Sequence, residues 1–269
     1  MALAKIARDA GNLAAIRATW GGSQNFLGAA WVEQLVDRAP QQARRQVALR
    51  LLALSPHYFY DRDIRAEDAR NRRSRVALAD ALIAPQCGRS DRVLDYGCGP
   101  GYLARAIAGS VARVTAVDIS RGVLACARAI NGAPNISYLR PDQLSPQPGQ
   151  IDLAYSFAVI QHLAQPALEA MLAVLANQVR EDGQVILHFV VPDGRGWRSE
   201  GDWRQSQSLA NRAKLHYGLN CFARTPEEMT DLASSAGFTD VIIRPLSGEI
   251  TIPGDDDIPS QHLLTARRK

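Results

Sequence analysis

The residues best placed to do chemistry lie in a short glycine-rich segment near the middle of the chain. Residues 93–102 read VLDYGCGPGY, an apolar run followed by an acid and three alternating glycines. Glycine lets the backbone turn sharply and approach a ligand without a Cβ in the way. A helix starting at Tyr102 would aim its free N–H groups at the same place. The segment predicts a small-molecule pocket where a strand meets a helix; the simpler alternative is a turn of no chemical meaning.

A glycine-rich loop between a strand and a helix is also typical of proteins that bind a nicotinamide dinucleotide. Dinucleotide-binding loops have the spacing Gly-x-Gly-x-x-Gly. Counted from Gly97, the third glycine position holds Tyr102, and the glycine comes one residue early, at Gly101. Asp95 also places a negative charge near where a pyrophosphate would lie. Both features disfavour NAD and favour a cofactor with cationic groups, which a carboxylate attracts.

The glycine loop and the acid after the next predicted strand resemble those of the class I S-adenosylmethionine (SAM)-dependent methyltransferases. The resemblance covers residues 91–269, about two-thirds of the chain, while residues 1–90 match no motif. It implies that the loop from Asp95 to Gly101 holds the methionine part of SAM. It also implies that Asp118, 17 residues after Gly101, binds both ribose hydroxyls. A carboxylate suits that task because it can accept from two adjacent hydroxyls.

A further acid, Asp142, matches the family position that accepts a hydrogen bond from the adenine amino group. The alternative is an ordinary loop aspartate beside a proline. Cys98 is expected to be a small buried loop residue without a catalytic role, because nothing nearby would activate it. The predicted cofactor-binding residues are Asp95, Gly97, Cys98, Gly99, Gly101, Asp118, Ile119, Asp142, Gln143, Ser156 and Phe157.

In members of the family, the turn after the fourth strand lies between cofactor and methyl acceptor. DNA and protein-amide N-methyltransferases carry two prolines and an aromatic residue there, whereas residues 155–158 read YSFA, without proline. That departure argues against adenine, cytosine or a glutamine amide as the acceptor. His162 follows and is the predicted catalytic base, because a hydroxyl must lose its proton and imidazole titrates near neutral pH. The alternative is that His162 only packs or bonds to the backbone.

Two further regions are predicted to meet the acceptor, the N-terminal helical part and the long segment 193–222, which has the length of a lid. Their aromatic rings, Trp203 included, either stack on an acceptor ring or sugar or form the core of the helical layer. The predicted acceptor residues are Tyr58, Tyr60, Trp197, His216 and Tyr217. His57 and His216 are second-tier bases, and His188 is expected to be buried structure.

The elements that must position these residues fall into two parts. Residues 1–90 have helical spacing of apolar residues, interrupted by prolines, and form a predicted N-terminal helical extension that serves as substrate cap or oligomer contact. Its charged stretch, 61–75, is expected to be an exposed helix face. The predicted helices of this part are 25–38, 41–54, 61–75 and 75–83.

From residue 91 to 269 strands alternate with helices, which predicts an α/β fold with a seven-stranded, mostly parallel, doubly wound sheet. Ligands bind such sheets beyond the carboxyl ends of the strands, where the candidate residues lie. Thr225 is expected to cap the last helix, which stops before Gly237. The predicted strands are 92–96, 111–117, 136–139, 151–157, 184–191, 241–244 and 262–266, and the other helices are 102–109, 121–130 and 166–179.

Composition excludes several classes. The net charge of +4 is not gathered into a run, so nucleic acid is not the expected partner. The four cysteines form no C-x-x-C pair, so neither a metal nor a disulfide framework is expected. The first 20 residues do not read as a signal peptide, and no segment has the roughly 18–20 apolar residues that span a bilayer. The cytoplasm is the expected compartment, and a homo-oligomer stays open.

These features together predict a SAM-dependent methyltransferase that methylates a hydroxyl on a small metabolite, such as a sugar, a lipid-linked compound or a secondary metabolite. A C- or N-methyltransferase on the same scaffold is one alternative. A catalytically inactive SAM-binding partner protein is another, although the intact acids and glycines count against it. A nucleic-acid methyltransferase is a weaker fourth interpretation.

Overall fold

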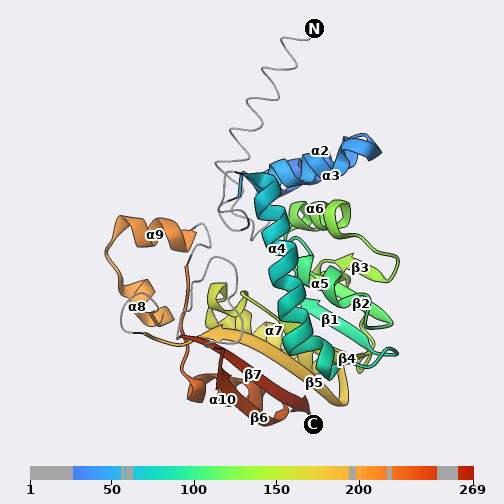
Figure 1. Cartoon of the computed structure of the whole chain (residues 1–269). Helices are drawn as coiled ribbons and strands as arrows, with labels where there is room; N and C mark the ends of the chain where they lie inside the picture. Colours follow the sequence, from blue (N-terminus) through green and yellow to red (C-terminus); the bar gives the residue numbers. More distant parts are fainter. Residues whose placement is uncertain (1–26, 56–57, 59–62, 194–197, 217–219, 247–259) are drawn as a thin grey trace.

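The centre of the molecule is one seven-stranded sheet (Figure 1). The computed structural model describes residues 27–55, 58, 63–193, 198–216, 220–246 and 260–269. The strands lie in the order β3-β2-β1-β4-β5-β7-β6, and all pairs are parallel except those of β7, which is antiparallel to both of its neighbours. The predicted mostly parallel sheet is confirmed. The strands are β1 Arg92–Tyr96, β2 Arg113–Val117, β3 Ile136–Leu139, β4 Ile151–Ser156, β5 Val179–Val190, β6 Phe238–Pro245 and β7 Gln261–Arg268.

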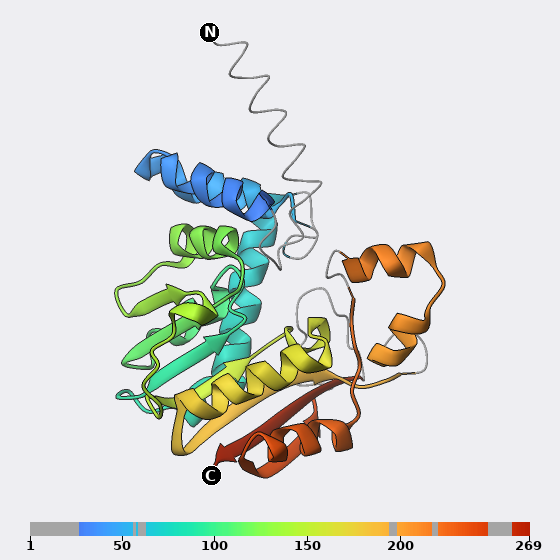
Figure 2. The ribbon, with the colours of Figure 1, turned by 180° about the vertical axis from the view of Figure 1, so that it is seen from behind.

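Helices cover both faces of the sheet and bury an apolar core on each (Figure 2). One face packs against α4 (Ile64–Leu78), α5 (Tyr102–Ile107) and α6 (Arg121–Asn131). The other packs against α7 (Gln165–Gln178) and α10 (Pro226–Ser235). Since β1, β4 and residues 185–190 of β5 are largely buried between the two helical layers, these segments are mostly apolar.

The N-terminal helices join the same body. Helices α2 (Leu27–Arg38) and α3 (Gln41–Leu52) pack on the outer side of α6, with Val32, Leu52 and Val123 in one apolar cluster. The predicted helices at 61–75 and 75–83 are one continuous element. It runs as α4, turns into the π-helix η1 (Ala79–Ile83) and ends in the 3₁₀-helix η2 (Ala84–Gln86).

The charged stretch of α4 is only partly the exposed face that its composition predicts: Arg65 and Arg73 are exposed, but the two acids on the helix are buried. Glu67 is 1% exposed and Asp68 9% exposed. Asp68 accepts hydrogen bonds from the Tyr102 hydroxyl at 2.8 Å and from Arg45 at 2.5 Å. Buried charges persist when they are paired and hydrogen-bonded, and here the partners come from α3 and α5. The acids of α4 therefore lie in the interface between α4 and its neighbouring helices. Asp68 connects α4 to Tyr102, the residue that follows the glycine loop.

Several element ends differ from the predicted ones. Strand β5 begins at Val179, five residues before the predicted start, because its pairing with β4 shifts register between Ile151 and Leu153. Thr225 caps α10 as predicted, since its hydroxyl accepts from the Glu228 N–H at 3.2 Å. Segment 193–222 holds two short helices, α8 (Glu200–Gln205) and α9 (Leu209–His216), beyond the carboxyl end of β5.

The described residues contain neither a membrane-spanning helix nor a cluster of metal-binding side chains. Among the helices there, none has the length and apolar character needed to cross a membrane. In the same ranges, no group of three or more His, Cys, Asp or Glu side chains is arranged to hold a metal ion. All four cysteines of the chain are free thiols.

Candidate functional site

The glycine loop connects β1 to α5 at the carboxyl edge of the sheet. Gly97, Gly99 and Gly101 have φ angles of +82°, +51° and +77°, a left-handed region that residues with a Cβ rarely adopt. Space is a second constraint. A Cβ on Gly97 would collide with the Val159 side chain, and one on Gly101 with the Tyr138 hydroxyl. The loop therefore requires glycine for both its conformation and its packing.

Asp118 follows β2 and faces this loop. Its carboxylate accepts hydrogen bonds from the Gly99 N–H at 3.0 Å and the Ser120 N–H at 2.9 Å. Burial raises the pKa of the Asp118 carboxyl to about 6, and these backbone N–H groups hold it from rising further. The carboxylate thus lies directly beside the loop, as the spacing predicts.

Asp95, at the end of β1, is 2% exposed. Burial raises the pKa of its carboxyl to about 7; the nearby Tyr155 hydroxyl lowers it and the Asp118 charge raises it. That hydroxyl lies short of hydrogen-bond geometry, since the described residues provide no hydrogen-bond partner for it or for Asp95 Oδ2. A buried polar atom without a partner costs about 1–3 kcal/mol. Asp95 therefore brings unused acceptor capacity to the base of the loop, and its carboxyl ionises near pH 7 rather than near pH 4.

Three further predicted cofactor residues lie just after β2 and β3, at the same carboxyl edge of the sheet. Ile119, next to Asp118, is a large apolar side chain that is 49% exposed. Asp142 and Gln143 lie after β3 in the 3₁₀-helix η3 (Pro141–Gln143), both exposed. Asp142 pairs with Arg140 at 2.6 Å, and the Gln143 side chain accepts from the Arg140 N–H at 2.9 Å. An exposed apolar surface and an exposed acid thus stand along one rim.

The turn after β4 is held on both sides. The Ser156 hydroxyl donates to the Tyr96 carbonyl at 2.8 Å, which joins β4 to β1 just before the glycine loop. Phe157 is 9% exposed and its ring lies parallel to that of His188, with centroids 6.0 Å apart. Ala158 has a φ angle of +57°, unusual for a residue with a Cβ. Backbone strain of this kind clusters at functional sites.

His162 ends the short 3₁₀-helix η4 (Ile160–His162) that follows the turn. Its Nδ1 lies 2.7 Å from the Asn220 carbonyl oxygen. A carbonyl only accepts, so Nδ1 carries the proton and Nε2 carries the lone pair of the neutral ring. Burial lowers the pKa of His162 below the ordinary 6.5, and the Asn220 contact partly offsets this. The ring is therefore neutral near pH 7, as a base must be.

The structure places only some of the predicted acceptor residues. Tyr58 lies against the glycine loop, since a Cβ on Gly99 would come within 3.3 Å of its ring. Trp203 is 8% exposed and donates from Nε1 to the Cys221 carbonyl at 2.9 Å, so it is core of the helical layer. His216 is the last residue of α9, but its side chain is not described. Tyr60, Trp197, Tyr217 and the second-tier His57 lie outside the described residues.

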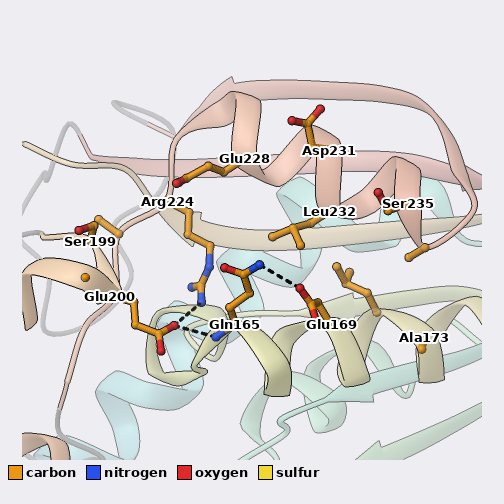
Figure 3. A pocket seen from close by; sticks show the side chains of 14 residues that line it. Gln165, Glu169, Ala173, Ser199, Glu200, Arg224, Glu228, Asp231, Leu232 and Ser235 are labelled. Carbon is orange, nitrogen blue, oxygen red and sulfur yellow. Dashed lines mark hydrogen bonds and ion pairs between the residues drawn. The ribbon is translucent and has the colours of Figure 1, made fainter. Parts of the chain in front are cut away.

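A separate hollow of about 730 Å³ lies between α7, α10 and the start of α8 (Figure 3). It contains none of the predicted site residues. Three of the four carboxylates that line it have structural partners: Glu200 accepts from the Gln165 N–H at 2.7 Å, Glu169 from the Gln165 amide at 2.9 Å, and Glu228 from the Thr225 N–H at 2.7 Å. Arg224 donates to the Leu163 carbonyl at 2.6 Å. The chemistry therefore belongs to the strand edge, not to this hollow.

Sequence reasoning missed the residues that support the site. Val159 and Tyr138 pack where Cβ atoms of Gly97 and Gly101 would be. Asn220 orients His162 from 58 positions away, and His188 contacts the turn from 30 positions away. No local spacing rule links residues so far apart, so only the folded chain reveals them.

Comparisons with known proteins agree with this geometry. A family model described as a methyltransferase domain matches residues 93–183. The ubiquinone biosynthesis O-methyltransferase of Thiobacillus denitrificans is 33% identical over 205 residues, which covers 69% of this chain and 81% of that protein. The chain covers only 45% of the protein of the same name from Klebsiella pneumoniae, at 28% identity. A tRNA U34 carboxymethyltransferase of Photobacterium profundum is 37% identical, over 42% of this chain and 35% of that protein.

Solved structures show the same fold. A SAM-dependent methyltransferase from Mesorhizobium loti has a TM-score of 0.54 at 21% identity, covering 71% of this chain and 98% of that chain. The phosphoethanolamine N-methyltransferase 2 of Haemonchus contortus, in complex with S-adenosyl-L-methionine, has a TM-score of 0.52 at 15% identity. That match covers 88% of this chain and 60% of that one. At such identities the likeness concerns the fold and carries no information on the acceptor.

Proposed function

Because the chain belongs to the class I SAM-dependent methyltransferases, with SAM as cofactor, we propose that it methylates a hydroxyl group of a small metabolite. The observation that carries the proposal is the state of His162. Its imidazole is neutral, its tautomer is set by the Asn220 carbonyl, and it follows the turn next to the glycine loop. A hydroxyl acceptor must lose its proton during methyl transfer, and a neutral imidazole can accept that proton.

The proposed cofactor contacts follow the strand edge. Gly97, Gly99 and Gly101 leave room for the methionine part, with Asp95 supplying negative charge opposite its ammonium group. Asp118 accepts from the two ribose hydroxyls, because its two oxygens retain lone pairs beyond those bonded to the Gly99 and Ser120 N–H groups.

The remaining proposed contacts hold the adenine and close the pocket. Ile119 offers its exposed apolar surface to one face of the ring. Asp142 accepts from the adenine amino group, with Gln143 bracing its short helix. Cys98, Ser156 and Phe157 are buried and hold the loop and the turn in shape.

The chain's own part in the reaction is alignment and proton removal. SAM supplies an electrophilic methyl group with a good leaving group, so alignment of donor and acceptor lowers the barrier most. Bound SAM would supply the methyl group to the acceptor oxygen with loss of its carbon–sulfur bond, leaving S-adenosylhomocysteine as the second product. The hydroxyl proton passes to Nε2 of His162. Burial keeps His162 unprotonated beforehand and so ready to accept that proton.

The relatives support a small ring-bearing acceptor without identifying it. Ubiquinone biosynthesis O-methyltransferases, by their name, act on a hydroxyl, and the match to one of them extends over 81% of its length. The relative that acts on tRNA is matched over only 35% of its length. We therefore propose a phenolic or other hydroxylated metabolite, in the cytoplasm, with no nucleic acid in the site. A role for residues 1–90 as a substrate cap is part of the same proposal, since Tyr58 lies at the glycine loop.

The test is transfer of a labelled methyl group from SAM. The chain is incubated with a metabolite extract of the source organism and, in parallel, with catechol, a hydroquinone and an aromatic amine. Label in an ether is the expected result. Label bound to carbon or nitrogen contradicts O-methylation, and SAM binding without transfer to any compound indicates an inactive partner protein. Steeply salt-dependent binding to tRNA, with label in the RNA, would favour the nucleic-acid interpretation.

A further inference from the structure

A second histidine touches the turn after β4 although the proposed reaction does not use it. His188, in the middle of the sheet on β5, is 1% exposed. Its Nδ1 accepts a hydrogen bond from the Ala158 N–H at 3.2 Å. Its ring lies nearly parallel to that of Phe157, at an interplanar angle of 12°. His188 therefore contacts two successive residues of the turn, one through a hydrogen bond and one through its face.

Ala158 needs such a contact. Its φ angle of +57° is in the left-handed region, where the Cβ crowds the backbone. The other described residues with a Cβ and positive φ are Asp182 and Asp240, whose short polar side chains tolerate this conformation better. Alanine has no side-chain group that could stabilise it. The hydrogen bond from its own N–H to His188 holds the turn against relaxation.

The turn after β4 contacts both the glycine loop and the short helix that carries His162. Val159 occupies the space in which a Cβ of Gly97 would lie, so it fills the back of the glycine loop. The Val159 carbonyl accepts from the His162 N–H at 2.8 Å, which starts the short helix that carries the predicted base. A shift at Ala158 would therefore move the support of the cofactor loop and the base together.

The acceptor role of Nδ1 requires one form of the imidazole. Because Nδ1 receives a proton from Ala158, the neutral ring must carry its own proton on Nε2. Burial lowers the pKa of His188 to about 4, so this neutral form dominates at physiological pH. His188 is unsuited as a proton acceptor from a substrate in that state, since its acceptor nitrogen is already bonded to the backbone.

We propose that His188 is a positioning residue that holds residues 157–159 in their left-handed turn and thereby aligns the glycine loop with His162. The part concerning His162 rests on the proposed function, whereas the part concerning the loop rests only on cofactor binding. Asparagine at position 188 retains an acceptor near the place of Nδ1, glutamine presents its acceptor near Nε2, and leucine retains neither.

The experiment measures binding of S-adenosylhomocysteine by calorimetry, which needs no acceptor. His188→Leu is expected to weaken binding about tenfold, the effect of releasing one strained left-handed residue. Ala158→Gly, which adopts positive φ without strain, is expected to bind within about twofold of wild type. The double variant is expected to recover to within about threefold of wild type, because glycine needs no hydrogen bond to stay left-handed. Loss of core packing alone would not be rescued by Ala158→Gly, and a double variant as weak as His188→Leu overturns the proposal.

The matched control is Phe189→Leu, the next residue on β5, which is fully buried on the opposite face of the sheet. It is expected to lower the melting temperature without changing the affinity. If His188→Leu does not fold, His188→Asn and His188→Gln are compared. Tighter binding by the Asn variant, about threefold or more, supports the proposal, and equal binding overturns it. Failure of O-methylation in the labelling test would leave these binding results unchanged, so the two failures are distinguishable.

Discussion

The proposed cofactor side and the proposed acceptor side of this site are built in different ways. The cofactor side consists of loops directly after β1, β2 and β3, whose residues bond to neighbours on the same edge, such as Asp118 to the Gly99 N–H. The acceptor side depends on distant partners, because His162 is oriented by Asn220 and its turn by His188. Local backbone geometry therefore positions the residues of the cofactor side, whereas the packing of distant elements positions those of the acceptor side. Variants of Asp118 and of His162 should consequently affect different measured quantities, whereas His188 supports both sides.

The largest expected effect separates the two sides at once. With an alcohol as acceptor, His162→Ala should lower the turnover rate about 10²–10⁴-fold, because the hydroxyl proton then lacks its base; with an acidic phenol the loss should be small. SAM affinity should stay nearly unchanged, since His162 bonds to Asn220 rather than to the glycine loop. Single-turnover kinetics with the acceptor found by labelling, together with calorimetry, measure both quantities.

A suitable control is His262→Ala, because His262 also contacts a backbone carbonyl, that of Ser260 at 3.2 Å, but packs on Phe189. It should retain turnover within about threefold of wild type. A His162 variant with turnover equally close to wild type would remove that residue as the base. A large loss in His216→Ala instead would move the chemistry to segment 193–222.

The second effect should appear in affinity alone. Asp118→Ala should weaken SAM binding by about 2–3 kcal/mol, because two ribose hydroxyls lose a charged acceptor. Asp118→Asn retains one acceptor oxygen and should fall between the alanine variant and wild type. Turnover at saturating SAM should change little. A turnover loss without an affinity loss would mean that Asp118 belongs to the acceptor side.

The third effect is a pH dependence that differs between the sides. The pKa of Asp118 is raised by burial to about 6, so the ionised acceptor is present above that pH and is lost as the pH falls through 6. Asp95, with a pKa raised by burial to about 7, acts in the same direction. Protonation of Asp118 alone should lower the SAM affinity about tenfold between pH 7.5 and pH 5, and Asp95 should add to this loss. Calorimetry across this range tests the drop, and a flat profile would contradict the proposed carboxylate contacts.

Turnover at saturating SAM should follow a different group. The pKa of His162 is lowered by burial, so the rate should rise with pH through a midpoint below 6.5. If this rise of the rate with pH disappears in His162→Ala, the imidazole of His162 is the group that titrates. If the variant shows the same midpoint, another group titrates.

The smallest effect is expected at the rim. Asp142→Ala should weaken SAM binding by about 1 kcal/mol, because it removes one hydrogen bond at an exposed position where water can replace it. The Arg140 pair adds little to stability, since exposed ion pairs are worth about 0–1 kcal/mol. Calorimetry ranks this variant against Asp118→Ala. An Asp142 variant clearly worse than the Asp118 variant would contradict the proposed adenine position at the end of β3.

The sequence by itself determined the sheet and the cofactor edge. Strands β1 and β3 begin and end at the predicted residues, and the predicted loop from Asp95 to Gly101 lies at the carboxyl end of β1. These features are local: apolar runs make buried strands, and positive φ requires glycine at fixed positions. The Thr225 cap was predictable for the same reason, because its partner Glu228 is three residues away.

Only the tertiary structure decided which polar residues are buried and what they hold. The charged residues of α4 suggest an exposed face, yet Asp68 is buried because Arg45 and Tyr102 reach it from two other helices. His188 was expected to be buried structure, but only the folded sheet brings its Nδ1 to the Ala158 N–H. A charge or an imidazole has a low free energy inside a protein only when its hydrogen-bond partners are present. Those partners are distant in the chain, so folding alone determines where such residues can lie and what they do.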